Sequence, residues 1–351
     1  MPVAMAGTLT NGALPLRLTP NIRVKNAEQL LEKLKRFRRD GTDALQVITD
    51  FDATLTQVFI DGQRASSCHS VVENFSGFPQ EYKDKANATL AKYQPLEMDP
   101  NLPFDTKLKY MNEWWTTSHN LMVAQDIHRD TVEHIVDEAV RNKRFSLREG
   151  SHAFLEVCTN LRIPVTVLSA GIQNIIEELL RRESIAGLVP TAHHDTIGED
   201  NMDLDAEEVH VVSNKMLFNE EGRLVDFSSD FIHTLSKKKY LRQYLERNPQ
   251  RHARHNVLAM GDLITDVSFL EAVPSCKNSI AIGYLNYQEK EDELLESYLD
   301  AFDVVILRDG SMDLCKQIIE YAATSETKDA GTESHDSSAV STGCTGRIAG
   351  C

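Results

Sequence analysis

The sequence predicts an α/β fold in which a Rossmann-like parallel sheet carries an inserted helical domain. Short apolar runs with the look of buried strands recur along the chain, and stretches with helical spacing separate most of them. Apolar strands that alternate with helices are typical of a parallel sheet with both faces covered. The interval 62–144 has helical spacing but no comparable strand, which predicts the insertion.

The predicted core comprises residues 26–61 and 145–324, and residues 1–25, which lack periodicity, are expected to form a loose arm before it. The strands expected in the core are LQVITDF (45–51), IPVTVLSA (163–170), VHVVSN (209–214), NVLAMGD (256–262), SIAIGYL (279–285) and DVVILRD (303–309). Runs such as 174–182 and 237–247 have the spacing of helices between these strands.

The insertion leaves the sheet after its first strand and returns before its second. Helical spacing is clearest in residues 80–93, 107–123 and 131–140. After the core, residues 325–351 are small and polar without an apolar face, so we expect a disordered tail.

The composition limits the partners. The 351-residue chain carries a net charge of −16 and has no apolar run near the roughly 18 residues that cross a bilayer. Affinity for nucleic acid comes largely from Lys and Arg that neutralise phosphates, so this acidic chain argues against such a partner. The six cysteines show no CxxC pairing and no signal peptide precedes them. We expect a cytoplasmic monomer with reduced thiols and no membrane partner.

Polar residues suited to phosphate and metal chemistry lie at the ends of the predicted strands. They are Asp50, Asp52 and Thr54 at the end of the first strand and just beyond it, Ser169 and Ala170 at the end of the second, Lys237 at a helix start, Asp262 at the end of NVLAMGD and Asp266 four residues beyond it. Ligands of open α/β sheets bind at the carboxyl edge, and free N–H groups at a helix start can hold an anion. The pattern therefore predicts a phosphate site with a metal ion.

These segments resemble known motifs. DFDATLT, LSAG, the lysine after HTLS, and GDLITD are similar to the four motifs of the haloacid dehalogenase superfamily of phosphotransferases. Further segments resemble the cytosolic 5′-nucleotidase type III family, which acts on pyrimidine and 7-methylguanosine nucleotides, over residues 45–321: CHSVVENF, LEMDP, YMNEWWTTSHNLM, LREG, VVSNKMLFNEEG and IGYLN. The resemblance implies a core of the haloacid dehalogenase type with a helical cap. It also implies a Mg²⁺-dependent 5′-nucleotidase that hydrolyses CMP, UMP or 7-methyl-GMP through an aspartyl-phosphate.

The chemistry expected of the site begins with a nucleophile and a cation. A phosphomonoester dianion repels a carboxylate, so attack by Asp50 needs a divalent cation, and an oxygen-only site suits Mg²⁺. Asp50 and Asp262 would bind it through their carboxylates. By resemblance, Asp52 adds its backbone carbonyl as a third metal ligand.

The side chain of Asp52 then remains available for proton transfer. Residues two apart in an extended segment point the same way, so this carboxyl can approach the leaving oxygen. It would protonate the nucleoside 5′-oxygen and later take a proton from the hydrolytic water. The groups expected to hold the phosphoryl oxygens are Thr54, Ser169, the Ala170 N–H and Lys237. Asp266 is expected to orient Lys237 or a metal-bound water.

Alternative interpretations remain for several of these residues. Two acids near a strand end can be solvated or can cap a helix, and Asp266 can cap the helix after GDLIT. Lys237 is preferred over Lys238 and Lys239 by resemblance alone. Family members more often have Ser and Asn where this chain has Leu263 and Ser236. The hydrogen bonds that surround the metal ligands are therefore not predicted by the resemblance. A thiol nucleophile formed by Cys68 and His69 is disfavoured because no third partner is evident.

Substrate choice is expected in the cap. By resemblance, Glu97 faces the base and Ser118 assists it, while Phe75, Trp114 and Trp115 are the candidates for stacking, each with core packing as the alternative. The cation of 7-methylguanine is attracted to a Trp face by roughly 0.5–2 kcal/mol, so the WW pair favours tolerance of this base. Two other functions are alternatives. One is a phosphatase of another small phosphorylated metabolite. The other is a phospho-receiver, which does not need a second aspartate at the position of Asp52.

Overall fold

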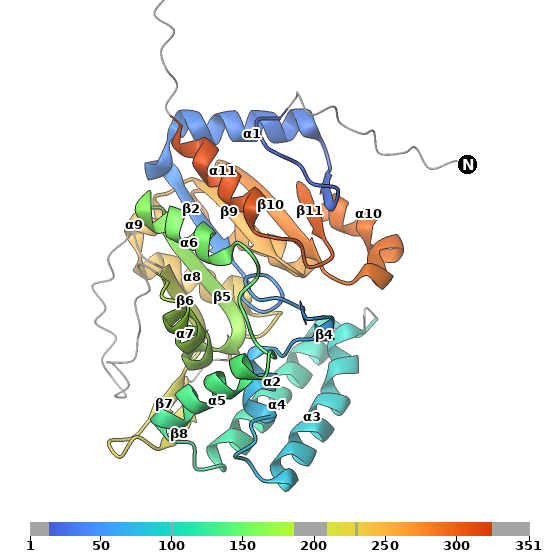
Figure 1. The fold of residues 1–351 in the computed structure, drawn as a ribbon, viewed down its shortest axis with the longest axis vertical. Helices are drawn as coiled ribbons and strands as arrows, with labels where there is room; N and C mark the ends of the chain where they lie inside the picture. The colour runs from blue at the N-terminus through green and yellow to red at the C-terminus, as the bar shows by residue number, and fades with distance from the viewer. Residues whose placement is uncertain (1–13, 100, 186–208, 229–230, 325–351) are drawn as a thin grey trace, which may run out of the picture.

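A seven-stranded sheet forms the centre of the protein (Figure 1). The computed structural model describes residues 14–99, 101–185, 209–228 and 231–324. The strands are β1 (Ile22–Val24), β2 (Leu45–Thr49), β5 (Val165–Ile172), β6 (Val209–Asn214), β9 (Asn256–Gly261), β10 (Asn278–Leu285) and β11 (Val304–Leu307), in the order β1-β11-β10-β9-β2-β5-β6. Every neighbouring pair is parallel except β1 with β11. All six predicted strands are confirmed, and β2 lies between β9 and β5.

Helices cover both faces of this sheet. The core elements are α1 (Ala27–Asp40), η1 (Thr42–Ala44), α6 (Ser151–Asn160), α7 (Gln173–Arg182), α8 (Lys237–Arg247), α9 (Pro249–His252), η3 (Ile264–Ala272), η4 (Gln288–Lys290), α10 (Glu291–Ala301) and α11 (Asp313–Ala323). Val47 of β2 belongs to the apolar cluster that contains Leu34 of α1, whereas the next residue, Ile48, belongs to the cluster of Leu241 in α8. This alternation explains why all five residues of β2 are buried, with helices against both faces of the strand.

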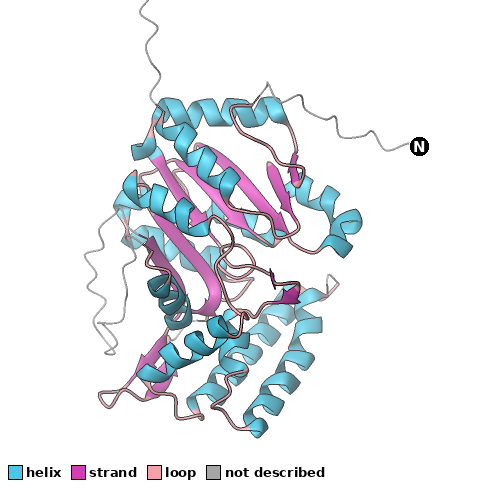
Figure 2. Cartoon of the chain, viewed as in Figure 1, coloured by secondary structure: helices cyan, strands magenta, loops and turns pink. Residues whose placement is uncertain are grey.

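The helical insertion lies beyond the carboxyl ends of β2 and β5, in the lower part of Figure 2, where helices predominate. It contains the short hairpin β3 (Phe59–Ile60) and β4 (Gln63–Arg64), followed by α2 (Cys68–Glu73), α3 (Gln80–Met98), α4 (Phe104–Val123) and α5 (Arg129–Arg141). We call α2–α5 the cap. In α5, the buried residues Val132, Ile135, Val136 and Ala139 recur at helical spacing.

A second hairpin, β7 (Met216–Phe218) and β8 (Leu224–Phe227), packs against the cap although it follows the core strand β6. Arg223 forms an antiparallel bridge with His128, and the Leu224 N–H donates to the Ile127 carbonyl at 2.7 Å. The Phe227 ring stacks on His119 of α4, with ring centroids 3.8 Å apart. The core predicted from the sequence includes this hairpin, because strands of three and four residues are too short to show a clear alternation of apolar and polar residues. A second part of the chain thus packs against the cap.

The start of the chain also differs from expectation. Residues Ile22–Val24, which fall in the predicted arm, form the edge strand β1 and pair with β11. A three-residue strand is too short to show alternation, which explains why it was missed. Residues 1–13 of the predicted arm and the predicted tail, 325–351, lie outside the described residues. Within the described ranges, no helix is long and apolar enough to cross a membrane.

Candidate active site

The carboxyl ends of three neighbouring strands bring the predicted site residues together. Asp50 follows β2 directly, and its N–H donates to the carbonyl of Met260 in β9 at 3.0 Å. Asp262 follows β9, and Ser169 lies near the end of β5 on the other side of β2. This edge is where open α/β sheets bind their ligands. The predicted convergence of these residues is therefore present.

A buried lysine links the acids. The ammonium of Lys237, at the first position of α8, lies 2.7 Å from Asp50 Oδ2 and 3.1 Å from Asp266 Oδ1. Burial lowers the pKa of Lys237, but the carboxylates of Asp266 and Asp50 outweigh this effect and raise it above its usual value. Lys237 therefore stays charged, and a fixed cation faces the proposed nucleophile. The neighbouring Lys238 instead pairs with Glu271 on the surface.

Three carboxylates form a candidate metal centre. One oxygen each from Asp50, Asp262 and Asp266 lies within 4.8 Å of the other two. Burial, followed by repulsion from Asp50 and Asp266, raises the pKa of Asp262 well above its usual value. Burial raises the pKa of Asp266 to about 6, although Lys237 opposes the shift. Acids held together against burial and repulsion fit a hard cation such as Mg²⁺.

Because Gly261 has no side chain, the side chain of Asp266 can pack against the end of β9. A Cβ atom at this glycine would lie 2.3 Å from both Cβ and Oδ2 of Asp266. The Leu263 N–H donates to Asp266 Oδ2 at 3.1 Å, which holds the carboxylate in this place. The Asp266 carboxylate therefore is part of the acid cluster and also pairs with Lys237. Both contacts go beyond capping a helix, the alternative role that the sequence leaves open for it.

The carboxylate of Asp52 points to the cap. Its Oδ1 and Oδ2 atoms accept the N–H of Cys68, the first residue of α2, at 3.1 and 3.3 Å. Burial, with a further contribution from Asp50, raises the pKa of Asp52 to about 7, while Cys68 and Lys237 oppose the shift. This carboxyl can thus exchange a proton near neutral pH. The cap supplies the donor that holds it.

The last residues of β5 are held in place from the adjacent strand β6. The side chain of Asn214 donates to the Ala170 carbonyl at 2.8 Å, and Ser213 Oγ donates to the Gly171 carbonyl at 2.8 Å. Ser169 Oγ accepts the Gly171 N–H at 3.0 Å. A Cβ at Gly171 would come within 3.0 Å of the sulfur of Cys68, so the glycine lets α2 approach the end of β5.

Thr54 is fully buried in the turn that follows Asp52. Among the residues that the structure describes, its Oγ1 has no hydrogen-bond partner. A buried hydroxyl without a partner costs about 1–3 kcal/mol, so this group is available to a ligand oxygen.

Glu97 of the cap contacts the loop that carries the lysine. Its Oε1 atom accepts the hydroxyl of Thr234 at 2.9 Å, and Thr234 lies three residues before Lys237. Burial raises the pKa of Glu97, opposed by the Thr234 bond and by the charges of Lys107 and Lys237. The bond to Thr234 therefore connects Glu97 with the core across the boundary between cap and core.

The two tryptophans of α4 have different surroundings. Trp115 and Ser118 lie on the buried side of this helix. The Trp115 ring contacts His69 edge-on at 5.4 Å, next to the residue that holds Asp52. Trp114 is half-buried and stacks on Tyr93 of α3. Phe75 packs edge-on against Phe78. Trp115 is thus linked through His69 to the start of α2, where Cys68 holds Asp52.

Sequence reasoning missed a histidine pair beside Trp115. The rings of His69 and His119 are parallel, with centroids 5.9 Å apart. Burial lowers the pKa of His69 to about 4, and burial with the nearby His69 lowers that of His119 to about 2, so both are neutral. In the described ranges, His69 Nε2 and both ring nitrogens of His119 have no hydrogen-bond partner. From sequence, His69 is considered only as a partner of Cys68, and His119 lies in a segment identified only by resemblance.

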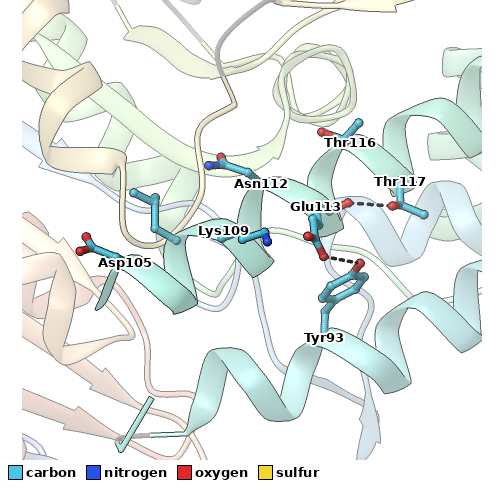
Figure 3. A pocket seen from close by; sticks show the side chains of 8 residues that line it. Tyr93, Asp105, Lys109, Asn112, Glu113, Thr116 and Thr117 are labelled. Carbon is cyan, nitrogen blue, oxygen red and sulfur yellow. Dashed lines mark hydrogen bonds between the residues drawn. The ribbon is translucent and has the colours of Figure 1, made fainter. Parts of the chain in front are cut away.

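A separate hollow of about 590 Å³ lies on the outer side of the cap, between α3 and α4 (Figure 3). Tyr93, Asn112 and Glu113 are among the residues lining it, and the Tyr93 hydroxyl donates to Glu113 Oε2 at 3.4 Å. Trp115 and Ser118 are not among the residues that line it. We therefore place the candidate active site at the sheet edge and not in this hollow.

Comparison with known families gives one match that covers most of the chain. The family model described as pyrimidine 5′-nucleotidase (UMPH-1) matches residues 53–190 and 196–323.

Individual relatives agree with this match. The chain is 31% identical over 308 residues to the 7-methylguanosine phosphate-specific 5′-nucleotidase A of Xenopus laevis, covering 88% of this chain and 98% of that protein. It is 32% identical to the 7-methylguanosine phosphate-specific 5′-nucleotidase of Homo sapiens, covering 81% of this chain and 87% of that protein. Among solved structures, cytosolic 5′-nucleotidase IIIB bound to cytidine matches with a TM-score of 0.73 and 27% identity, over 87% of this chain and 94% of that one.

Proposed function

The chain belongs to the pyrimidine 5′-nucleotidase family, and we propose that it hydrolyses pyrimidine and 7-methylguanosine 5′-monophosphates with Mg²⁺ through an aspartyl-phosphate on Asp50. The observation that carries this proposal is the arrangement of Asp50, which lies 2.7 Å from the Lys237 ammonium and shares a cluster with Asp262 and Asp266. Family membership argues against the phospho-receiver hypothesis. The cytoplasmic location and monomeric state stay predictions.

Asp50 is the proposed nucleophile. Its carboxylate would attack phosphorus, and the bond to the nucleoside 5′-oxygen would break as the bond to Asp50 forms. Lys237 would face the phosphoryl oxygens with its fixed charge, assisted by Thr54, Ser169 and the Ala170 N–H. The residues that would hold Mg²⁺ are Asp50, Asp262 and the Asp52 carbonyl, and the position of Asp266 in the acid cluster supports a role for it there too. The ion would supply positive charge against the phosphate dianion.

Asp52 is the proposed proton donor and acceptor. In the first step its carboxyl would give a proton to the departing nucleoside oxygen. In the second it would take a proton from the water that attacks the phosphorus of the aspartyl-phosphate, which releases phosphate and restores Asp50. A pKa of about 7 suits a group that must both give and take a proton near neutral pH. The experiment that tests the function is turnover of a panel of nucleoside monophosphates with Mg²⁺. A chain active on sugar phosphates but not on CMP or 7-methyl-GMP would contradict it.

We predict that Glu97→Ala raises KM for nucleotides about tenfold to a hundredfold while p-nitrophenyl phosphate hydrolysis changes little. Losing a charged partner of a base donor costs about 1.5–3 kcal/mol, and the phosphoryl site lies on the core, away from α3. Thr234→Val is the matched control, because it removes the group that Glu97 contacts across the boundary without removing the carboxylate. Equal losses of Glu97→Ala on nucleotides and on p-nitrophenyl phosphate would assign Glu97 a structural role instead.

We predict that Trp115→Tyr reduces kcat/KM for 7-methyl-GMP more than for CMP. Only the methylated guanine brings a positive charge to the ring, and the weaker cation–π contact of Tyr lowers this attraction by a fraction of the roughly 0.5–2 kcal/mol involved. Trp114→Tyr is the control, since that ring stacks on Tyr93. If both substrates lost equally with Trp115→Tyr, this side chain would serve the packing of the cap.

A further inference from the structure

The two connections between core and cap run side by side. The outgoing segment follows Asp52, and the returning segment ends at Arg148. Thr56 forms an antiparallel bridge with Leu147, and the Arg148 N–H donates to the Leu55 carbonyl at 2.7 Å. The place where the cap joins the core is therefore one short two-stranded crossing, directly after the proposed nucleophile and proton donor.

Ala53 lies at the start of this crossing in a strained conformation. Its φ is 58°, in the left-handed region that residues other than glycine seldom adopt. Such a residue is strained and persists only where its surroundings hold it. Here the Ala53 N–H donates to Thr56 Oγ1 at 2.9 Å, and its carbonyl accepts Arg148 Nη2 at 2.6 Å and Asn286 Nδ2 at 2.9 Å. Both polar groups of Ala53 are thus held by side chains.

Arg148 is the centre of this arrangement, and its side chain is fully buried. Its Nε donates to the Thr54 carbonyl, and Nη1 lies 2.9 Å from Asp309 Oδ1. Asn286 Oδ1 accepts Nη2 at 3.0 Å, so this residue binds both Arg148 and Ala53. Asp309 in turn accepts the Phe59 N–H at 2.9 Å. We call Arg148, Asn286 and Asp309 the arginine clamp.

We propose that the arginine clamp is a positioning device for Asp52 and that Arg148 is a positioning residue for the reaction; the inference rests on the function proposed above. The peptide that joins Asp52 to Ala53 is planar, so an N–H of Ala53 that is held by Thr56 also sets the direction of the Asp52 carbonyl. That carbonyl is the proposed metal ligand, and the Asp52 side chain starts from the same residue. Release of Ala53 would misplace both groups without touching the acids themselves.

A buried arginine also stabilises the fold, so Arg148 could have a purely structural role. That role predicts a loss of stability without a specific change in catalysis or metal binding. Arg251 offers a matched comparison: it is equally buried, but donates to the carbonyl of Val165 at the amino end of β5, away from the catalytic edge. Both Arg148→Met and Arg251→Met should lower the melting temperature. Only Arg148→Met should change the catalytic and metal-binding properties.

The test compares these variants with wild type. We expect Arg148→Met to lower kcat about tenfold to a hundredfold, the effect of a misplaced catalytic group, with KM for CMP within about threefold of wild type. The half-saturating Mg²⁺ concentration should rise, and hydrogen–deuterium exchange of residues 53–59 should increase in the absence of substrate and metal. Arg251→Met should show neither effect. Loss of stability alone with Arg148→Met, or the same kinetic change with Arg251→Met, would overturn the proposal.

Two further variants keep the test decisive if Arg148→Met fails to fold. Asn286→Ala removes one donor from the Ala53 carbonyl and should show the same changes more weakly. Ala53→Gly removes the strain, since glycine adopts positive φ freely, and should restore part of the kcat lost in Asn286→Ala. Wild-type exchange and kinetics in Asn286→Ala would overturn the clamp. If the wild-type protein turned over no nucleotide, the proposed function would be contradicted. The hydrogen–deuterium exchange measurement would still test whether the arginine clamp holds residues 53–59.

Discussion

Asp50→Asn is expected to abolish turnover of every phosphate substrate, by at least about 10⁴-fold in kcat, while the protein still folds. The amide has nearly the shape of the carboxylate but cannot form the acyl-phosphate, and removal of a nucleophile typically costs a factor of this order or more. Lys237 keeps Asp266 as a partner at 3.1 Å, so the substitution does not leave a buried cation alone. Rapid-quench measurement of kcat on CMP and on p-nitrophenyl phosphate provides the readout.

A second observable separates the nucleophile from a general electrostatic role. Beryllium fluoride forms a mimic of the acyl-phosphate on an aspartate, and it should inhibit the wild type but leave no bound adduct on Asp50→Asn. The melting temperature of the variant should stay near that of wild type. Appreciable turnover by Asp50→Asn would remove this residue from its proposed role.

Removal of the metal is expected to have a comparable effect. Exhaustive chelation should silence the wild type, and Mg²⁺ should restore it, because the clustered carboxylates of Asp50, Asp262 and Asp266 repel a phosphate dianion when no cation is present. Asp262→Asn should raise the half-saturating Mg²⁺ concentration at least about tenfold. Loss of a residue that only orients a metal ligand already lowers metal affinity by about this factor. Ca²⁺ should inhibit, since it accepts more ligands and looser geometry.

The control for charge alone is Asp303→Asn. Asp303 pairs with Lys33 at 2.6 Å just before β11 begins, at the opposite end of the sheet from the acid cluster. This variant should need no more Mg²⁺ than the wild type. Activity that survived chelation would contradict the metal-dependent mechanism, and equal Mg²⁺ requirements for both variants would remove Asp262 from the metal site.

The parts of the site that sequence could predict are those with a local signature. β2 and β9 are mostly apolar and each is followed directly by an acid, and parallel strands bring their carboxyl ends to one edge, so Asp50 and Asp262 could be placed together before any coordinates. Helical spacing likewise predicts α4. These inferences need only a period and a direction of the chain.

The parts that sequence could not predict depend on pairings between distant residues. Arg148 and Asn286 are separated by 138 positions, and nothing around LREG or IGYLN shows that both side chains reach the carbonyl of Ala53. The bond from the Cys68 N–H to Asp52 is likewise invisible, because a backbone donor leaves no mark in residue type. The hairpin β7–β8 joined the cap for the same reason: its contacts with α4 and α5 are tertiary.

The hydrogen bond from the Cys68 N–H to the Asp52 carboxylate bears on how this enzyme is divided into modules. In a modular architecture, an inserted domain selects the substrate and the host domain carries a complete reaction centre. Here the insertion contributes a main-chain donor to a carboxyl of the host, so the proposed reaction centre is shared across the boundary. Exchange of this insertion for one from a distant relative would transplant selectivity only if the incoming segment also presented an amide at the position of Cys68.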